Sequence, residues 1–177
     1  MHECRGRISS LLFLVFLGIF PSNPEVFAMD TLTLSSSAFK QNGPVPSKYT
    51  CDGADVNPPL AINVVPAGAR SLALIVDDPD APAGVWVHWV VWNIGANTTE
   101  IKENSVPQGA QQGLTDFRDR KYGGPCPPSG THRYFFKLYA LDTVLTLGPA
   151  ATKPALDQAM KGHIIGQTEL IGKYSRK

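Results

Sequence analysis

The chain has 177 residues, and its sixteen Lys and Arg against fifteen Asp and Glu leave a formal net charge of +1. That length suits one domain with a short appendage. Nucleic-acid phosphates are bound by strongly basic surfaces, so the near-neutral charge argues against a nucleic-acid partner. Sixteen Gly and fifteen Pro disfavour a coiled coil or a helical bundle and favour a compact domain rich in turns.

The N-terminal segment has the layout of a cleaved secretory signal. Two arginines precede the apolar run 11–20, and residues 26–28, Val-Phe-Ala, resemble a cleavage site. The apolar run is shorter than the roughly 20 residues of a membrane span. We expect residues 1–28 to be a signal peptide and 29–177 to be an exported domain, periplasmic or secreted. An uncleaved anchor, or a true start at Met29, is the alternative.

Export changes the expectation for the cysteines. Cys4 would leave with the signal, which leaves Cys51 and Cys126 in the exported domain. An oxidising compartment would allow these two to form a disulfide. Two separate buried thiols are the alternative, because a sequence does not give the distance between them. Both interpretations stay open at this point.

Most of the remaining chain predicts strands. Alternating or continuous apolar runs, rich in β-branched and aromatic residues, predict strands near 31–34, 60–64, 71–76, 87–94, 134–141 and 168–174. Between them, 42–46 predicts a loop and 95–122 predicts long irregular connections.

One short helix is predicted near the C-terminal end. Thr152 is placed to cap it, with Pro154 in its first turn. Leu156 and Met160 then share its inner face. Because the connections are too short and too poor in helix for repeated βαβ units, the fold class is mainly β with one or two short helices.

Polar residues gather where the buried strands end. Asp77, Asp78 and Asp80 follow one strand and are stiffened by two prolines. Such residues suit a turn, but crowded carboxylates also raise one another's pKa, which would let one of them donate to an anion. His88 begins the next strand on the same face as Trp86, and a purely structural histidine is the alternative there.

A third polar segment, 121–134, is dense in glycine and proline. Glycines allow close approach of a backbone to a ligand, and prolines lower the entropy lost in holding a loop ready. Successive backbone N–H groups in such a loop can bind an anion. His132 and Tyr134 then lie on one face of the strand that follows. An ordinary Gly/Pro loop is the alternative.

Taken together, 78–82, the His88 strand and 123–134 resemble the phosphatidylethanolamine-binding protein family, also called the Raf kinase inhibitor-like family. The resemblance extends over most of the chain after the signal, and the Gly-Gly-Pro-Cys-Pro-Pro sequence resembles the bacterial branch. It implies a large antiparallel β-sheet packed on a smaller sheet with few short helices. It also implies a small surface pocket for phosphate-like anions.

The resemblance implies a ligand-binding set of eight residues: Asp78, Asp80, Trp86, His88, Gly124, Pro125, His132 and Tyr134. In this set both histidines would donate N–H bonds to the anion, more strongly when protonated. Gly124 would offer its backbone, the aspartates would orient the histidines or a ligand amine, and the aromatic rings would form the wall. No catalytic residue, metal or cofactor is expected.

The expected function is therefore an exported, non-catalytic binding protein for a small phosphorylated or anionic ligand, such as a phospholipid headgroup. An inhibitor or regulator of another protein, such as a protease or kinase, is the alternative. An enzyme is a third reading: His88, His132 and an aspartate would suit a metal site. However, the sequence lacks His-Glu-x-x-His and Gly-x-Ser-x-Gly. A homodimer is implied by the resemblance alone.

Overall fold

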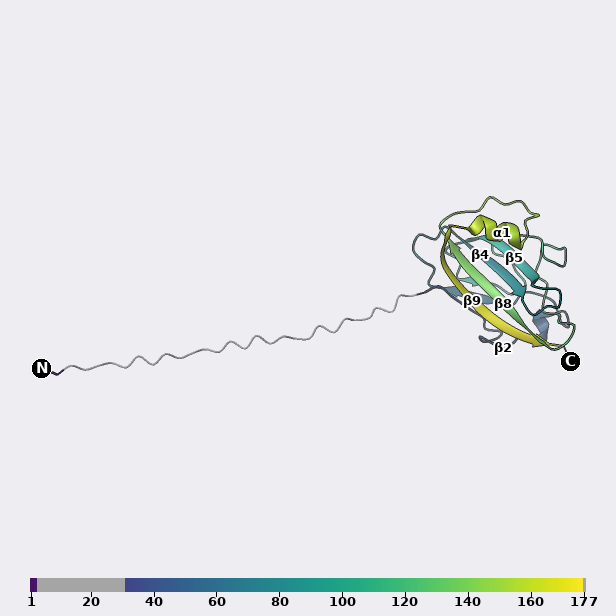
Figure 1. Cartoon of the computed structure of the whole chain (residues 1–177), viewed down its shortest axis with the longest axis horizontal. Helices are drawn as coiled ribbons and strands as arrows, with labels where there is room; N and C mark the ends of the chain where they lie inside the picture. Colours follow the sequence, from purple (N-terminus) through teal and green to yellow (C-terminus); the bar gives the residue numbers. More distant parts are fainter. Residues whose placement is uncertain (3–30, 177) are drawn as a thin grey trace.

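The computed structural model describes residues 1–2 and 31–176. The predicted signal peptide, 1–28, therefore lies outside the described residues except for its first two. The domain consists of two β-sheets and one short α-helix (Figure 1). In chain order the strands are β1 (Thr33–Ser35), β2 (Gly43–Pro44), β3 (Leu60–Asn63), β4 (Ser71–Asp78), β5 (Trp86–Gly95), β6 (Glu100–Ile101), β7 (Gln111–Gln112), β8 (Thr131–Leu141) and β9 (Ile164–Ser175).

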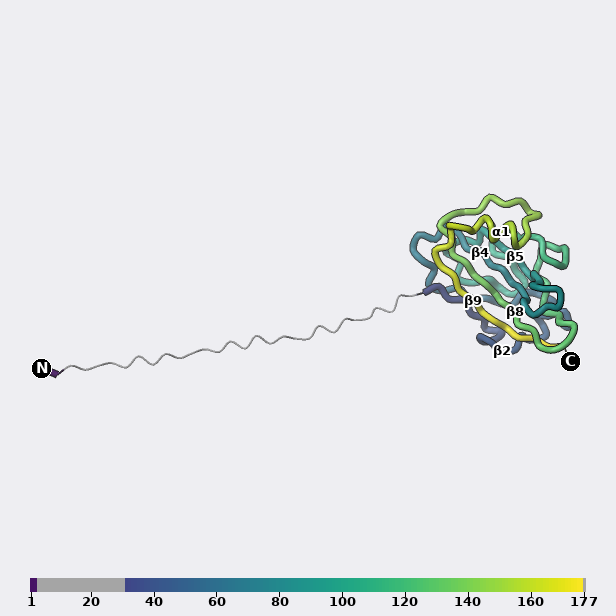
Figure 2. The backbone as a smooth tube through the Cα atoms, in the orientation of Figure 1, coloured from purple at the N-terminus to yellow at the C-terminus, as the bar shows by residue number. Residues whose placement is uncertain are grey.

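The larger sheet has six strands in the order β2-β9-β8-β4-β5-β7, and the smaller has three in the order β1-β3-β6. The prediction of a mainly β fold with a large and a small sheet is confirmed. One detail differs: the segment 42–46, predicted as a loop, contains β2, which pairs in parallel with the end of β9. Figure 2 shows the chain passing through β2 beside the end of β9. The large sheet is thus antiparallel in all its pairings except this one.

The long apolar run that predicts a buried strand is β4, and every residue of it is buried. Leu72, Leu74 and Val76 pack into the core between the two sheets. Ala73 and Ile75, on the opposite face, belong to the second core under the helix. Because both faces of β4 are covered, its sequence shows no alternation of polar and apolar residues.

The helix α1 (Lys153–Met160) covers the outer face of the large sheet. Leu156 and Met160 are buried against that sheet, as their spacing predicts. Thr152 holds the N-cap position, but its side chain makes no capping hydrogen bond. No helix within 1–2 and 31–176 is long and apolar enough to cross a membrane.

The sheet register brings three strand ends together. Asp78, the last residue of β4, pairs with Trp86 at the start of β5. On the other side of β4, Asp77 pairs with Phe135 near the start of β8. Consequently the acidic corner, the start of the His88 strand and the beginning of β8 meet where these neighbouring strands of the large sheet end. The sequence separates Asp78 from His132 by 54 residues.

Candidate functional site

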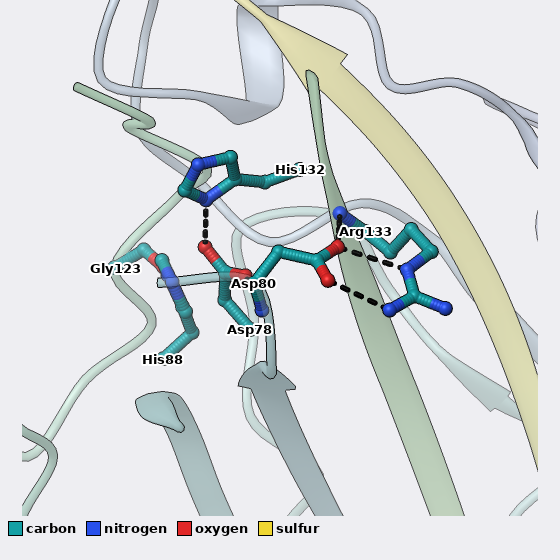
Figure 3. Close-up of polar contacts among 6 residues, drawn as sticks. All are labelled: Asp78, Asp80, His88, Gly123, His132 and Arg133. Carbon is teal, nitrogen blue, oxygen red and sulfur yellow. Dashed lines mark hydrogen bonds and ion pairs between the residues drawn. The ribbon is translucent and has the colours of Figure 1, made fainter. Parts of the chain in front are cut away.

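A cavity of about 270 Å³ opens where these strand ends meet. Four residues of the predicted set line it: Asp78, Trp86, His88 and His132. Figure 3 shows Asp78 lying between the two histidine rings, which come from β5 and β8. The structure therefore brings together residues from three strands, as a binding site requires.

His132 is held by Asp78. Its Nδ1 atom lies 2.7 Å from Oδ2 of Asp78, and since a carboxylate accepts, Nδ1 donates (Figure 3). The second oxygen of Asp78 accepts the backbone N–H of Asp80 at 2.8 Å. Both Asp78 and His132 are buried, so the imidazole is fixed in orientation. Its Nε2 atom is left for other contacts.

His88 is held differently, by a backbone carbonyl. Its Nδ1 atom lies 2.7 Å from the carbonyl oxygen of Gly123. The side chain is only 3% exposed, and burial is the main reason that its pKa is lowered. The rings of Phe117 and Tyr134 stand edge-on to the imidazole, each with its centre 5.2 Å away. His88 is thus a neutral imidazole in an aromatic wall.

The hydroxyl of Tyr134 is buried without a hydrogen-bond partner among the described residues. The side chain is fully buried on β8, beside His88. Burial is the main reason that its pKa is raised; the nearby carboxylate of Asp78 adds to that effect, and the backbone of Cys126 opposes it. The hydroxyl therefore keeps its proton and is available as a donor. Tyr134 is not among the residues that line the cavity; its ring packs against His88, which does.

The three carboxylates of the acidic corner each have their own basic side chain as a partner. Lys137 pairs with Asp77 at 2.8 Å, and His132 pairs with Asp78. The guanidinium of Arg133 donates to both oxygens of Asp80, from Nη2 to Oδ1 at 2.7 Å and from Nε to Oδ2 at 2.9 Å (Figure 3). These hydrogen bonds lower the pKa of Asp80 to about 2. Asp80 is therefore not the carboxyl whose pKa crowding would raise, because Arg133 neutralises its charge.

Gly124 and Pro125 lie behind the cavity rather than on its wall. The N–H of Gly124 donates to Oδ1 of Asp55 at 2.6 Å, so this amide already has an acceptor. A Cβ at Gly124 would come within 2.5 Å of the Tyr49 carbonyl oxygen. The carbonyl of Pro125 accepts the N–H of Cys51 at 3.2 Å. Glycine is thus needed at 124 for packing against the segment after η1 (Ser47–Tyr49).

A disulfide ties the same two segments together. The sulfur atoms of Cys51 and Cys126 are bonded, with 5.5 Å between the Cα atoms. Of the two alternatives left open by the sequence, the structure has the bridge. Cys126 also lines the cavity, so the cross-link anchors one wall of the site.

The sequence interpretation missed Phe117. It lies in the segment 95–122, which predicts only irregular connections, and it is 43% exposed at the cavity wall. Its ring packs against Trp86, with 5.5 Å between ring centres, and covers Gly123. A phenylalanine within a polar loop was the available signal.

The histidines and carboxylates at the cavity do not form a recognisable metal-binding group. Within the part of the chain that the structure describes, no three His, Cys, Asp or Glu side chains are grouped so as to hold a metal ion.

Comparison with known proteins identifies the family. Residues 35–175 match the family model described as Phosphatidylethanolamine-binding protein. The chain belongs to the phosphatidylethanolamine-binding protein family. A UPF0098 protein of Methanothermobacter thermautotrophicus is 52% identical over 150 residues, which cover 82% of this chain and 99% of the relative. A UPF0098 protein of Chlamydia muridarum is 42% identical over 154 residues, with 82% and 99% covered.

Solved structures of the family share the fold. A putative phosphatidylethanolamine-binding protein homolog from Chlamydia trachomatis is 42% identical with a TM-score of 0.80, over 83% of this chain and 99% of that one. YbcL of Escherichia coli, described as a new member of the mammalian family, is 30% identical with a TM-score of 0.79, over 84% and 100%. The relatives come from archaea and bacteria, so the likeness is not confined to the bacterial branch.

Proposed function

We propose that this protein is a non-catalytic binding protein for a small oxyanion, either phosphate or the phosphate of an ester such as a lipid headgroup. The observation that carries the proposal is a cavity lined by two histidines whose Nδ1 atoms are held by Gly123 and Asp78. The buried, unpartnered hydroxyl of Tyr134, whose ring packs against His88, adds a donor next to that cavity. A hydroxyl and a carboxylate-held imidazole suit the oxygens of a phosphate group. The names given to relatives, which mention phosphatidylethanolamine, support the same ligand chemistry.

The non-catalytic part of the proposal rests on how the histidines are used. The Nδ1 atoms bind a backbone carbonyl and Asp78, and the described hydrogen bonds include none between either ring and a serine or cysteine. Neither Ser129 nor Thr131, the hydroxyl residues just before His132, is among the residues that line the cavity. Covalent catalysis needs a nucleophile paired with a base, and the described hydrogen bonds give neither histidine such a partner, which supports a binding role.

We also propose that the protein acts outside the cytoplasm. The disulfide supports this, because such bonds persist in oxidising compartments. The signal-like sequence of 1–28 supports it independently. N-terminal sequencing of protein recovered from the exported fraction should begin at Met29, and recovery only from the cytoplasm with an intact N-terminus would contradict export.

A titration with inorganic phosphate tests the binding function. The histidine ring signals of His88 and His132 should shift and saturate in NMR spectra, and the unchanged ring of His163 serves as an internal control. Tyr134→Phe should weaken phosphate binding about tenfold, because a hydrogen bond to a charged group is lost. The same substitution at Tyr139, in the second core, should not. No shift at millimolar phosphate would exclude the proposed function.

A further inference from the structure

We infer that the cavity accepts an oxyanion that carries its own proton and rejects one that does not, because His88 presents a hydrogen-bond acceptor to the ligand. The inference rests on the proposed function and narrows its ligand class. Hydrogen phosphate and the monoanion of a phosphomonoester would fit, whereas sulfate and a phosphodiester without another donor would not.

The hydrogen bond to Gly123 fixes the tautomer of His88. A backbone carbonyl can only accept, so the Nδ1 atom at 2.7 Å from it must carry the ring proton. In a neutral imidazole only one nitrogen carries a proton. The Nε2 atom therefore has a lone pair, and no described side chain donates to it. Since His88 lines the cavity, this lone pair is offered to the ligand.

The surroundings keep His88 neutral. The ring is almost fully buried and packs between the edges of two aromatic rings. The charged and titratable groups that face it are Asp77 and Asp78 at the end of β4, Asp55 after η1, and His132 and Tyr134 on β8. The three carboxylates favour the charged ring, but burial outweighs them and lowers its pKa.

The two histidines of the site therefore differ in role. His132 has the Asp78 carboxylate 2.7 Å from Nδ1, which can pair with a charged ring and lets Nε2 donate to an anion. His88 has a carbonyl in that place, which does not compensate a charge. The prediction that both histidines donate to the anion is replaced, in this inference, by one donor and one acceptor.

A bare anion oxygen opposite the His88 lone pair would leave two acceptors facing each other. Both groups would lose their hydrogen bonds to water without replacement, which penalises binding. A phosphorus-bound hydroxyl removes that penalty, because it donates to Nε2. Sulfate has the same tetrahedral shape as phosphate but no proton near neutral pH. The two ions therefore form a matched pair of probes.

Calorimetric titration of the purified protein at pH 7, at equal ionic strength, tests the inference with sodium phosphate and sodium sulfate. Phosphate should bind at least about tenfold more tightly than sulfate. Equal binding of the two ions would overturn the inference and leave the proposed function standing. Failure of both ions to bind would overturn the proposed function, and the inference with it.

A pH series separates a proton on the ligand from a proton on the protein. Affinity for methyl phosphate should fall as pH rises through the ligand's second pKa, about 6 for a phosphomonoester. A phosphonate with a higher second pKa should move the midpoint upward by the same difference. Dimethyl phosphate, which has no acidic proton, should bind weakly throughout. A midpoint that is the same for every ligand would overturn the inference.

His88→Gln supplies the matched variant. Its side-chain amide can turn an N–H toward the cavity. The ratio of phosphate affinity to sulfate affinity should therefore fall toward one. His163→Gln is the control, because the Nδ1 atom of His163 also has an oxygen partner, Oδ1 of Asp142 at 2.8 Å, but the side chain is exposed outside the cavity. It should keep the preference of the unmodified protein. Retention of that preference in His88→Gln would contradict the inference even if the overall affinity fell.

Discussion

Asp78 and His132 form a buried pair, 2.7 Å apart, between the end of one strand and the start of another. The pairing of β4 with β8 sets this distance. A carboxylate that holds one imidazole nitrogen fixes the direction of the other, which is how ligand-binding histidines are commonly oriented. The pair is therefore the part of the site where fold and ligand chemistry meet most directly.

Asp78→Asn should weaken phosphate binding about tenfold, because the carboxylate that holds Nδ1 of His132 is replaced by a neutral amide. The free energy of unfolding should fall by about 1–3 kcal/mol as a buried charge-assisted hydrogen bond is lost. Phosphate titration and urea unfolding measure the two effects.

The matched control is Asp142→Asn. Asp142 also binds a histidine Nδ1 atom, that of His163, but both side chains are about half exposed. Exposed pairs contribute little, so stability should change by less than about 1 kcal/mol and phosphate affinity should stay the same. Equal effects of the two substitutions on phosphate binding would show that the Asp78 pair does not serve the ligand.

Sequence patterns predict much of this fold, because apolar runs such as 71–76 report burial directly. They do not give the partner of a polar side chain, which depends on strand register. The Asp78–His132 contact spans 54 residues and could not be read from spacing. The packing of Gly124 under the segment after η1 depends likewise on a loop-to-loop contact. Two-residue strands such as β6 are too short to show any period.

Asp80→Asn should affect stability slightly and phosphate binding hardly at all. The Asp80 carboxylate is held by Arg133 at the surface and does not line the cavity. Its loss should cost at most about 1 kcal/mol, because solvent screens exposed ion pairs. A lowered pKa means that this contribution is present above the ordinary aspartate pKa and is lost as pH falls toward about 2. A loss of affinity as large as that of Asp78→Asn would show that Asp80 contacts the ligand.

Gly124→Ala should destabilise the loop that carries Cys126. The added Cβ would lie 2.7 Å from both Oδ1 of Asp55 and the Cα of Thr50, so backbone must move. Overpacking of this kind costs about 1–3 kcal/mol in urea unfolding. Gly148→Ala is the control, because a Cβ there meets nothing within 4 Å. Equal stability of the two variants would show that the loop has room to adjust.

Removal of the disulfide should lower stability more than any single substitution above. The bridge links positions 75 residues apart, and the chain-entropy model gives about 4 kcal/mol for a loop of that length. Cys51→Ser combined with Cys126→Ser should lower the melting temperature, and reduction of the unmodified protein should do the same. An unchanged melting temperature, with two free thiols verified by titration, would contradict this expectation.

His88 should make the protein sensitive to mild acid. Its folded pKa is lowered by burial, whereas in the unfolded chain a histidine titrates near its ordinary value of about 6.5. Below that pH the unfolded state binds more protons than the folded state, so the free energy of unfolding falls as pH drops. The loss continues until the pH passes the lowered folded pKa.

Urea unfolding between pH 7.5 and 5, in buffers without phosphate or sulfate, measures this loss. Because one proton is involved, the free energy of unfolding should fall by at most about 1.4 kcal/mol per pH unit. His88→Gln should flatten the curve, since glutamine does not titrate. His163→Gln should leave the His88 contribution in place, because only an exposed histidine is removed. If both variants lost stability with acid as steeply as the unmodified protein, the sensitivity would arise elsewhere and His88 would not be held neutral by its burial.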